Sequence, residues 1–120
     1  IAWFAVGIFP AHPVLIASGS MRPVMEVGDV AIVAKIPDKN LKVGDVIEFR
    51  KSERINVVHR IIDIEEQGGK RVFITKGDAN SEADSDPVLA ANVVGKVVFQ
   101  VPKIGWIGVG IKSFFVQEQT

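Results

Sequence analysis

A short polar turn near the N-terminus carries the first candidate for chemistry in this chain of 120 residues. Ser18 and Ser20 flank a glycine, and Met21, Arg22 and Pro23 follow. Glycine lets the backbone turn tightly and proline stops regular structure, so Ser20 can stand clear of the chain as a nucleophile. Serine and glycine are also ordinary turn residues, so an unreactive turn is the plain alternative.

Histidine supplies the second candidate, because a serine nucleophile needs a base within hydrogen-bond reach. His59 lies in the apolar, β-branched segment Val57–Ile61, whereas the other histidine, His12, stands beside Pro13. Neutral imidazole suits the role of general base near pH 7. A histidine in an apolar strand is also commonly a hydrogen-bonded core residue, and this is the alternative for His59.

An oxygen-rich segment at residues 75–86 supplies the acidic side chains, including Asp78 and Asp84. A carboxylate beside an imidazole fixes the tautomer of the ring and stabilises the imidazolium that forms after proton transfer. One of these aspartates can therefore orient His59. A solvated acidic loop is the alternative.

The alternating acidic and amide residues of this segment also resemble a calcium-binding loop. The sixth loop position is Ala83, where the sharp turn of such a loop needs glycine, and the twelfth is Leu89, where a bidentate glutamate is needed. The sequence therefore argues against a calcium site, and we expect no metal or cofactor.

Composition limits the class of protein. The length fits one domain with a real core. The formal net charge is zero and no run of lysine or arginine occurs, so the electrostatic footprint of a nucleic-acid-binding protein is missing. The chain has no cysteine, which excludes disulfides, thiol catalysis and cysteine-ligated metals.

Strand patterns dominate the part of the chain that must position these residues. Short apolar or alternating runs are separated by Gly, Pro and Asp, and Gln67–Lys70 is typical of a hairpin turn. Asp29 and Asp45, each behind a glycine, are expected to bond to nearby amides in turns that open strands. The predicted strands are Val30–Ala34, Val46–Arg50, Ile55–Glu65, Arg71–Thr75 and Val93–Val101. The sequence predicts a single, mainly β, mostly antiparallel domain.

Both ends of the chain are apolar. The first nine residues are uncharged, too short to span a bilayer, and followed by Pro10 and Pro13. We expect residues 1–16 to be the end of a truncated N-terminal membrane anchor or an interfacial segment, with a buried segment as the alternative. Residues 17–120 are expected to form a catalytic peptidase domain. The stretch 104–116 suits either a membrane interface or a final core element.

In their order along the chain, these pieces resemble the type I signal peptidases of the archaeal and endoplasmic-reticulum kind. The resemblance covers nearly the whole chain. The matching segments are Ser18–Pro23, Val43–Ile47, His59–Arg60, Thr75–Asn80 followed by Asp84, Val94–Val97 and Pro102–Gly105.

The resemblance implies a membrane-bound serine endopeptidase that removes signal peptides from secreted preproteins and cuts after small residues. Ser20 is then the nucleophile and His59 the base, where bacterial members use a lysine. Ser18 and the backbone amide of Ser20 would form the oxyanion hole. Asp84 would support His59 and Asp78 would hold the shape of the site, although the sequence leaves open which aspartate pairs with the histidine.

The same resemblance implies how and where substrate binds. An extended peptide would pair with the backbone of two segments, 14–18 and 57–59, so Val14, Ile16, Val57 and Val58 are the expected substrate-binding residues. The expected partners are preprotein signal peptides and membrane lipids, with further subunits left open and no nucleic acid. The catalytic domain would lie on the extracytoplasmic or lumenal side of the plasma membrane or endoplasmic reticulum.

Two other functional classes are compatible with this general β architecture. One is a non-catalytic, membrane-associated β binding module. The other is a self-cleaving repressor or a lysine-dependent peptidase. The absence of a DNA-binding segment argues against the repressor, and the absence of a lysine from the strand around His59 argues against the lysine-dependent peptidase.

Overall fold

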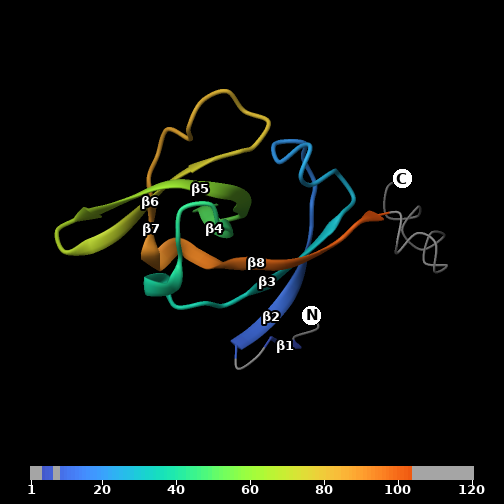
Figure 1. Cartoon of the computed structure of the whole chain (residues 1–120), viewed down its shortest axis with the longest axis horizontal. Coiled ribbons are helices and arrows are strands. Elements are labelled where there is room, and N and C mark those ends of the chain that lie inside the picture. The colour runs from blue at the N-terminus through green and yellow to red at the C-terminus, as the bar shows by residue number, and fades with distance from the viewer. Residues whose placement is uncertain (1–3, 7–8, 104–120) are drawn as a thin grey trace.

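The computed structural model describes residues 4–6 and 9–103, and side chains from Pro10 onward. Within this part of the chain, eight strands form one antiparallel sheet in the order β1-β2-β3-β8-β4-β5-β6-β7 (Figure 1). The strands are β1 (Phe4–Val6), β2 (Phe9–Leu15), β3 (Val30–Ala34), β4 (Val46–Ser52), β5 (Ile55–Gln67), β6 (Lys70–Lys76), β7 (Val88–Leu89) and β8 (Val93–Val101), and two 3-10 turns are η1 (Asp38–Asn40) and η2 (Ala90–Asn92). The predicted mainly β, antiparallel fold is confirmed.

All five predicted strands are present, and β3 and β8 have the predicted bounds. Strands β5 and β6 meet in the predicted hairpin, where Gly68 and Gly69 have φ of 60° and 79°. A left-handed pair of this kind matches the twist of the two strands, and glycine adopts it without a steric penalty.

Strand β2 was not predicted from the sequence. Residues 9–15 fall inside the segment expected to be an anchor or interfacial segment, but they pair with β3 from Ala11 to Leu15. Pro13, which would end a helix, is tolerated here, because it lies beyond the Phe9–Ala11 stretch in which the described residues of β1 pair with β2. Residues 9–15 therefore belong to the same sheet as the candidate site.

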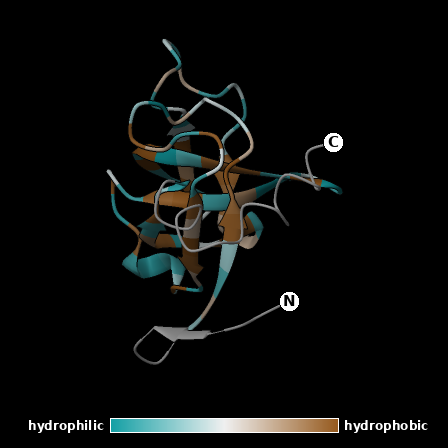
Figure 2. Ribbon diagram, turned by 90° about the vertical axis from the view of Figure 1, so that its right-hand side faces the viewer, coloured by the Kyte–Doolittle hydropathy of each residue, from teal (hydrophilic) through white to brown (hydrophobic). Residues whose placement is uncertain are grey.

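The core consists of two apolar clusters, and hydrophobic residues gather along the strands (Figure 2). The first cluster lies under β4, β5 and β6 and the second under the turn that follows β2. The buried residues are Leu41, Ile47, Phe49, Ile61, Phe73 and Val88 in the first cluster, and Ile16, Met21, Met25, Ala31 and Val46 in the second.

The sheet curls so that its two halves approach each other. Strands β3, β8 and β4 separate β2 from β5 in the hydrogen-bonded order. Nevertheless Oγ of Ser20, in the turn after β2, lies 3.2 Å from Nε2 of His59 on β5. The pairs β3–β8, β4–β8, β4–β5 and β5–β6 each contain a register shift. Irregularities of this kind increase local twist and allow a sheet to fold back on itself.

Asp29 ties the turn after β2 to the end of β8. Its carboxylate accepts hydrogen bonds from the backbone amides of Glu26 and Lys103 and from the side chain of Gln100, all at 2.9 Å. Burial opposes ionisation, but these donors together hold the pKa of Asp29 below its ordinary value. Asp45 likewise accepts the amide of Lys42, so both aspartates bond to nearby amides as predicted.

The described residues contain no helix that is long and apolar enough to cross a membrane. Residues 1–3 of the expected anchor or interfacial segment and the whole stretch 104–116, expected to lie at a membrane interface or to form a final core element, lie outside the described residues.

Candidate active site

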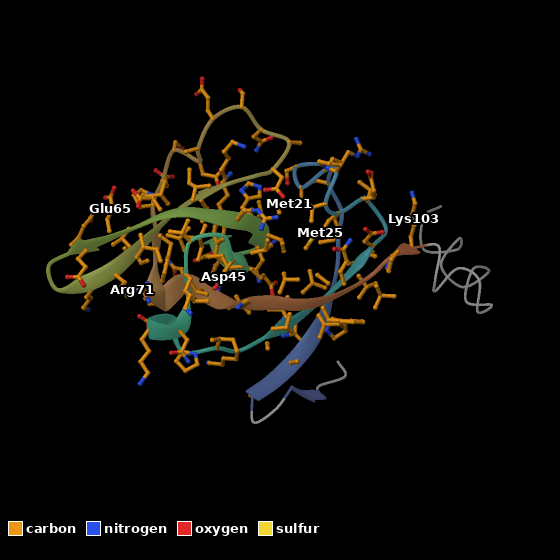
Figure 3. The ribbon with its side chains drawn as sticks, viewed as in Figure 1. Met21, Met25, Asp45, Glu65, Arg71 and Lys103 are labelled. Carbon is orange, nitrogen blue, oxygen red and sulfur yellow. The ribbon has the colours of Figure 1, made fainter. Side chains whose placement is uncertain are left out.

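Ser20 is held in place by the buried residues that follow it in the chain. Met21 and Met25 are 1% and 2% exposed and pack into the second core cluster beneath the turn (Figure 3). The amide of Arg22 donates to the carbonyl of Gly19 over 3.1 Å, and this hydrogen bond closes the turn. From the other side, the amide of Ala79 donates to the carbonyl of Ser20 over 2.8 Å. The Ser20 side chain therefore projects from a backbone anchored on two sides.

His59 lies on β5 with its ring directed at the turn. The residue is 8% exposed, and its Nε2 is 3.2 Å from Oγ of Ser20. The edge of the ring meets Phe49, with ring centroids 6.2 Å apart and the planes at 69°. This contact limits rotation of the imidazole, so Nε2 stays aimed at the serine hydroxyl.

Asp84 meets the other nitrogen of the imidazole. Its Oδ2 lies 2.6 Å from Nδ1 of His59. A carboxylate oxygen accepts, so Nδ1 carries the proton and Nε2 is left free to accept one from Ser20. The loop after β6 brings Asp84 into place by arching toward the turn after β2 (Figure 1).

Thr75 secures Asp84 at two points. The amide of Asp84 donates to the carbonyl of Thr75 over 2.8 Å, and Oγ1 of Thr75 donates to Oδ2 of Asp84 over 2.7 Å. Thr75 is fully buried on β6, where an unpaired hydroxyl would be costly. Sequence reasoning gave no role to Thr75. A hydroxyl residue directly after the apolar run Val72–Ile74 is the sequence signal that could have identified it.

Asp78 faces a different partner. Its two carboxylate oxygens accept a bidentate pair of hydrogen bonds from Arg60, at 2.9 and 2.8 Å. The same guanidinium donates to the carbonyl of Gly44 at 2.7 Å. The hydrogen bonds from Arg60 lower the pKa of Asp78 below its ordinary value, and Asp78 in turn raises the pKa of Arg60. Of the two aspartates, Asp84 is the one beside His59. Arg60, next to His59 in the chain, was not assigned this contact from the sequence.

Gly77 is required by the close packing around the site. A Cβ atom at this position would lie 2.7 Å from the carbonyl oxygen of Ser20 and 3.1 Å from Nε2 of His59. Both distances are tighter than side chains normally adopt, and the backbone oxygen cannot swing away as a flexible side chain would. The absence of a side chain lets the loop after β6 approach Ser20 and His59 together.

Ser18 lies beside Ser20 on the same turn. The two hydroxyl oxygens are 3.2 Å apart, and the amide of Ser20 is 3.5 Å from Oγ of Ser18. A hydroxyl and an amide are thus gathered next to the candidate nucleophile. Two such donors are the usual means of stabilising a developing oxyanion in acyl transfer.

A cavity of about 790 Å³ opens beside these residues. It is lined by Ser18, Ser20, His59 and Asp84 and by the four expected substrate-binding residues, Val14, Ile16, Val57 and Val58. Among the described residues, two strand edges are available along it. Strand β6 pairs with β5 only from Arg60 onward, and the described part of β1 pairs with β2 only as far as Ala11. These two edges of the described sheet suit an extended peptide lying between them.

Comparison with known proteins places this arrangement in a family. Residues 1–80 match the family model described as signal peptidase, peptidase S26. Signal peptidase I W of Bacillus subtilis (strain 168) is 45% identical over 89 residues, which cover 72% of this chain and 47% of the relative. The signal peptidase complex catalytic subunit SEC11 of Lachancea thermotolerans is 33% identical over 112 residues, which cover 83% of this chain and 66% of the relative. SEC11 of Clavispora lusitaniae is 31% identical over 119 residues, covering 89% and 71%. The chain thus spans 47% of the first relative and 66% of the second.

Proposed function

The chain belongs to the peptidase S26 family of signal peptidases, and we propose from this premise that it is a serine endopeptidase that removes signal peptides from secreted preproteins. One observation carries the proposal. Ser20 Oγ, the His59 ring and Asp84 Oδ2 form a continuous line of contacts at 3.2 and 2.6 Å along the wall of a cavity. Such a line is what a serine needs to attack a peptide carbonyl.

In the proposed reaction, Oγ of Ser20 attacks the carbonyl carbon of the scissile peptide bond while Nε2 of His59 takes the hydroxyl proton. Asp84 holds the Nδ1–H tautomer and stabilises the imidazolium. His59 then gives its proton to the leaving amine, and the acyl group remains as an ester on Ser20. A water molecule gives a proton to His59 as it attacks the ester, and His59 passes that proton to Oγ of Ser20 as the C–Oγ bond breaks and the cleaved signal peptide leaves.

The oxyanion of each tetrahedral intermediate would be held by the hydroxyl of Ser18 and the amide of Ser20. Removing one such donor typically costs about 3 kcal/mol of transition-state stabilisation. In the free protein the amide of Ser20 donates to Oγ of Ser18 over 3.5 Å, so the two groups lie next to each other. Asp78 and Arg60 would act further away, by fixing the loop whose Ala79 amide holds the carbonyl of Ser20.

Substrate would bind as an added strand in the cavity, between the β2 side and β5. Val14, Ile16, Val57 and Val58 would contact its side chains, and small residues would occupy the first and third positions before the cut. The apolar ends of the chain would keep the site near a membrane, on the extracytoplasmic or lumenal face. Membrane lipids and signal peptides would be its partners.

The test is cleavage of a preprotein by the chain in detergent micelles, with the new N-terminus identified by mass spectrometry. We expect a cut after a small residue, and none with Ser20→Ala at an unchanged melting temperature. Ser52→Ala, at the exposed end of β4, is the control and should cut normally. Ser18→Ala should slow turnover by roughly one to three orders of magnitude. A chain that binds the preprotein without cutting it would be a binding module, and full activity in Ser20→Ala would exclude the serine mechanism.

Membrane attachment is tested separately by vesicle flotation. We expect the chain to float with lipid vesicles, because the apolar ends bury in the interface. A chain that stays monodisperse without detergent and remains at the bottom of the gradient would contradict the proposed location while leaving the chemistry untouched.

A further inference from the structure

Glu48 is a buried carboxylate that the proposed chemistry does not use. It lies on β4 and is 5% exposed. Each of its oxygens meets a side chain from a different strand. Oε1 is 2.9 Å from Nε2 of His12 on β2, and Oε2 accepts a hydrogen bond from Nδ2 of Asn56 on β5 at 3.0 Å. The carboxylate thus joins two strands that the sheet order keeps apart.

The burial of this group needs an explanation. Taking a carboxylate out of water costs several kcal/mol, which an apolar residue at position 48 would avoid. Its neighbours Ile47 and Phe49 are apolar core residues. A buried charge is tolerated when both oxygens are paired, as they are here. The pairing also fixes geometry, because each hydrogen bond to Glu48 holds its donor side chain in one position.

One donor, Asn56, lines the substrate cavity, and the other, His12, lies on a strand whose later residues line it. Asn56 lines the cavity on the β5 side, three residues before His59. His12 lies two residues before Val14, which lines the cavity on the β2 side. At about 3.3 Å per residue in a strand, Asn56 is roughly 10 Å from His59, which is the length of about three extended substrate residues. The two walls are therefore joined twice, by Ser20 and His59 at one end and through Glu48 at the other.

We propose that Glu48 is a positioning residue that sets the separation of the two cavity walls, with His12 and Asn56 as its ties. The inference rests on the proposed function, because the strand held between the walls is the peptide substrate. Backbone pairing on both edges of an added strand requires a fixed spacing between the two edges. A cavity held at that spacing binds an extended peptide without having to order its walls first.

The network acts on binding more than on the chemical step. Ser20 and His59 are held by their own contacts, from the Ala79 amide and from Asp84, and neither involves Glu48. Loss of the ties therefore raises KM and leaves kcat nearly unchanged. A general loss of stability would instead lower the melting temperature and the amount of active enzyme without this split.

The experiment measures kcat and KM for a peptide that spans a preprotein cleavage site, with the whole chain in detergent micelles. We expect Glu48→Ala to raise KM by about tenfold, as the loss of one or two hydrogen bonds implies, with kcat changed less than about twofold. Glu65→Ala is the matched control, because Glu65 is an exposed carboxylate at the remote end of β5 (Figure 3) and should change neither constant.

Two further variants cut one tie each. His12→Phe keeps a ring and removes the donor, and Asn56→Ala removes the donor on the cavity wall. Because both ties end on Glu48, their effects on KM should be coupled, so the double variant should raise KM by clearly less than the product of the single effects. If Glu48→Ala does not fold, His12→Phe, Asn56→Ala and their double variant still test the proposal.

The outcomes separate this inference from the proposed function. If the wild-type protein cuts no peptide, the proposed function is wrong. If wild-type protein cuts the peptide but Glu48→Ala leaves KM unchanged, only the role of Glu48 is overturned. The same holds if the effects of His12→Phe and Asn56→Ala on KM simply multiply.

Discussion

Thr75 donates a hydrogen bond from Oγ1 to Oδ2 of Asp84 over 2.7 Å, and this oxygen is the one that lies 2.6 Å from Nδ1 of His59. The threonine hydroxyl and the imidazole thus share one acceptor. Because Thr75 is fully buried on β6, it provides a rigid support for a carboxylate that stands on a loop. The position of the carboxylate against His59 depends on this support.

Removal of the Thr75 hydroxyl should therefore slow the reaction. Thr75→Val keeps the branched shape and leaves Asp84 with one donor fewer, so we expect turnover to fall by about tenfold, the equivalent of one hydrogen bond. Thr75→Ser keeps the hydroxyl and should restore most of the rate. Steady-state kinetics of both variants, with melting temperatures, make the comparison. Wild-type turnover in Thr75→Val would show that the hydrogen bond has no part in the reaction.

Asp84 and Asp78 should differ in what their loss affects. Asp84→Asn keeps the size of the side chain and removes the charge beside His59. Turnover should fall strongly, by a factor that reaches about 10⁴ if the carboxylate governs the tautomer, with little change in melting temperature. Asp78→Asn should lower activity and melting temperature together, because it breaks the pair with Arg60 and loosens the loop. A fully active Asp84→Asn beside an inactive, stably folded Asp78→Asn would reverse these roles.

The ion pair of Asp78 with Arg60 should also make stability depend on pH. Arg60 lowers the pKa of Asp78 in the folded protein below the ordinary value of 3.8. The pair therefore stabilises the fold above the unfolded pKa, and this contribution is lost as the pH falls through the folded pKa.

Urea unfolding of wild type and Asp78→Asn from pH 7 to pH 2 measures this contribution. We expect wild type to be more stable by about 1–3 kcal/mol at neutral pH, since the Asp78 side chain is 17% exposed and that of Arg60 31%. The difference should shrink toward zero at the acid end. A difference that stays constant across the range would mean that the charge of Asp78 contributes nothing.

Gly77 gives a test of how closely the site is packed. In Gly77→Ala the new methyl group must push against the carbonyl of Ser20 and against His59. A displacement of about 1 Å at a reacting group costs on the order of 10²-fold in rate, and we expect a loss of that size. Gly68→Ala is the matched control. It places alanine at φ of 60° in the remote hairpin with open space around it, so it should lower stability and leave turnover unchanged. Equal activity of the two variants would contradict the close approach.

The amino-acid pattern was sufficient to predict most of the sheet. Residues that alternate or run apolar between Gly, Pro and Asp turns form strands wherever the pattern is strong, as at Val30–Ala34 and Val93–Val101. Strand β2 was missed because two prolines and an apolar N-terminus look like the end of an anchor. Its pairing with β3 is a long-range contact, and local periodicity carries no information about it.

The sequence by itself determined which residue types are available for chemistry: a serine in a tight turn, two histidines, a group of aspartates and no cysteine. Only the tertiary structure decided which of them meet. The approach of Ser20 to His59, the placement of Asp84 rather than Asp78 beside the imidazole, and the junction of His12 and Asn56 at Glu48 all depend on how far the sheet curls. Curl is the sum of small twists and register shifts over many strands. A change of a few degrees in the twist between neighbouring strands decides whether two side chains separated by three strands are in contact. No single residue specifies that twist.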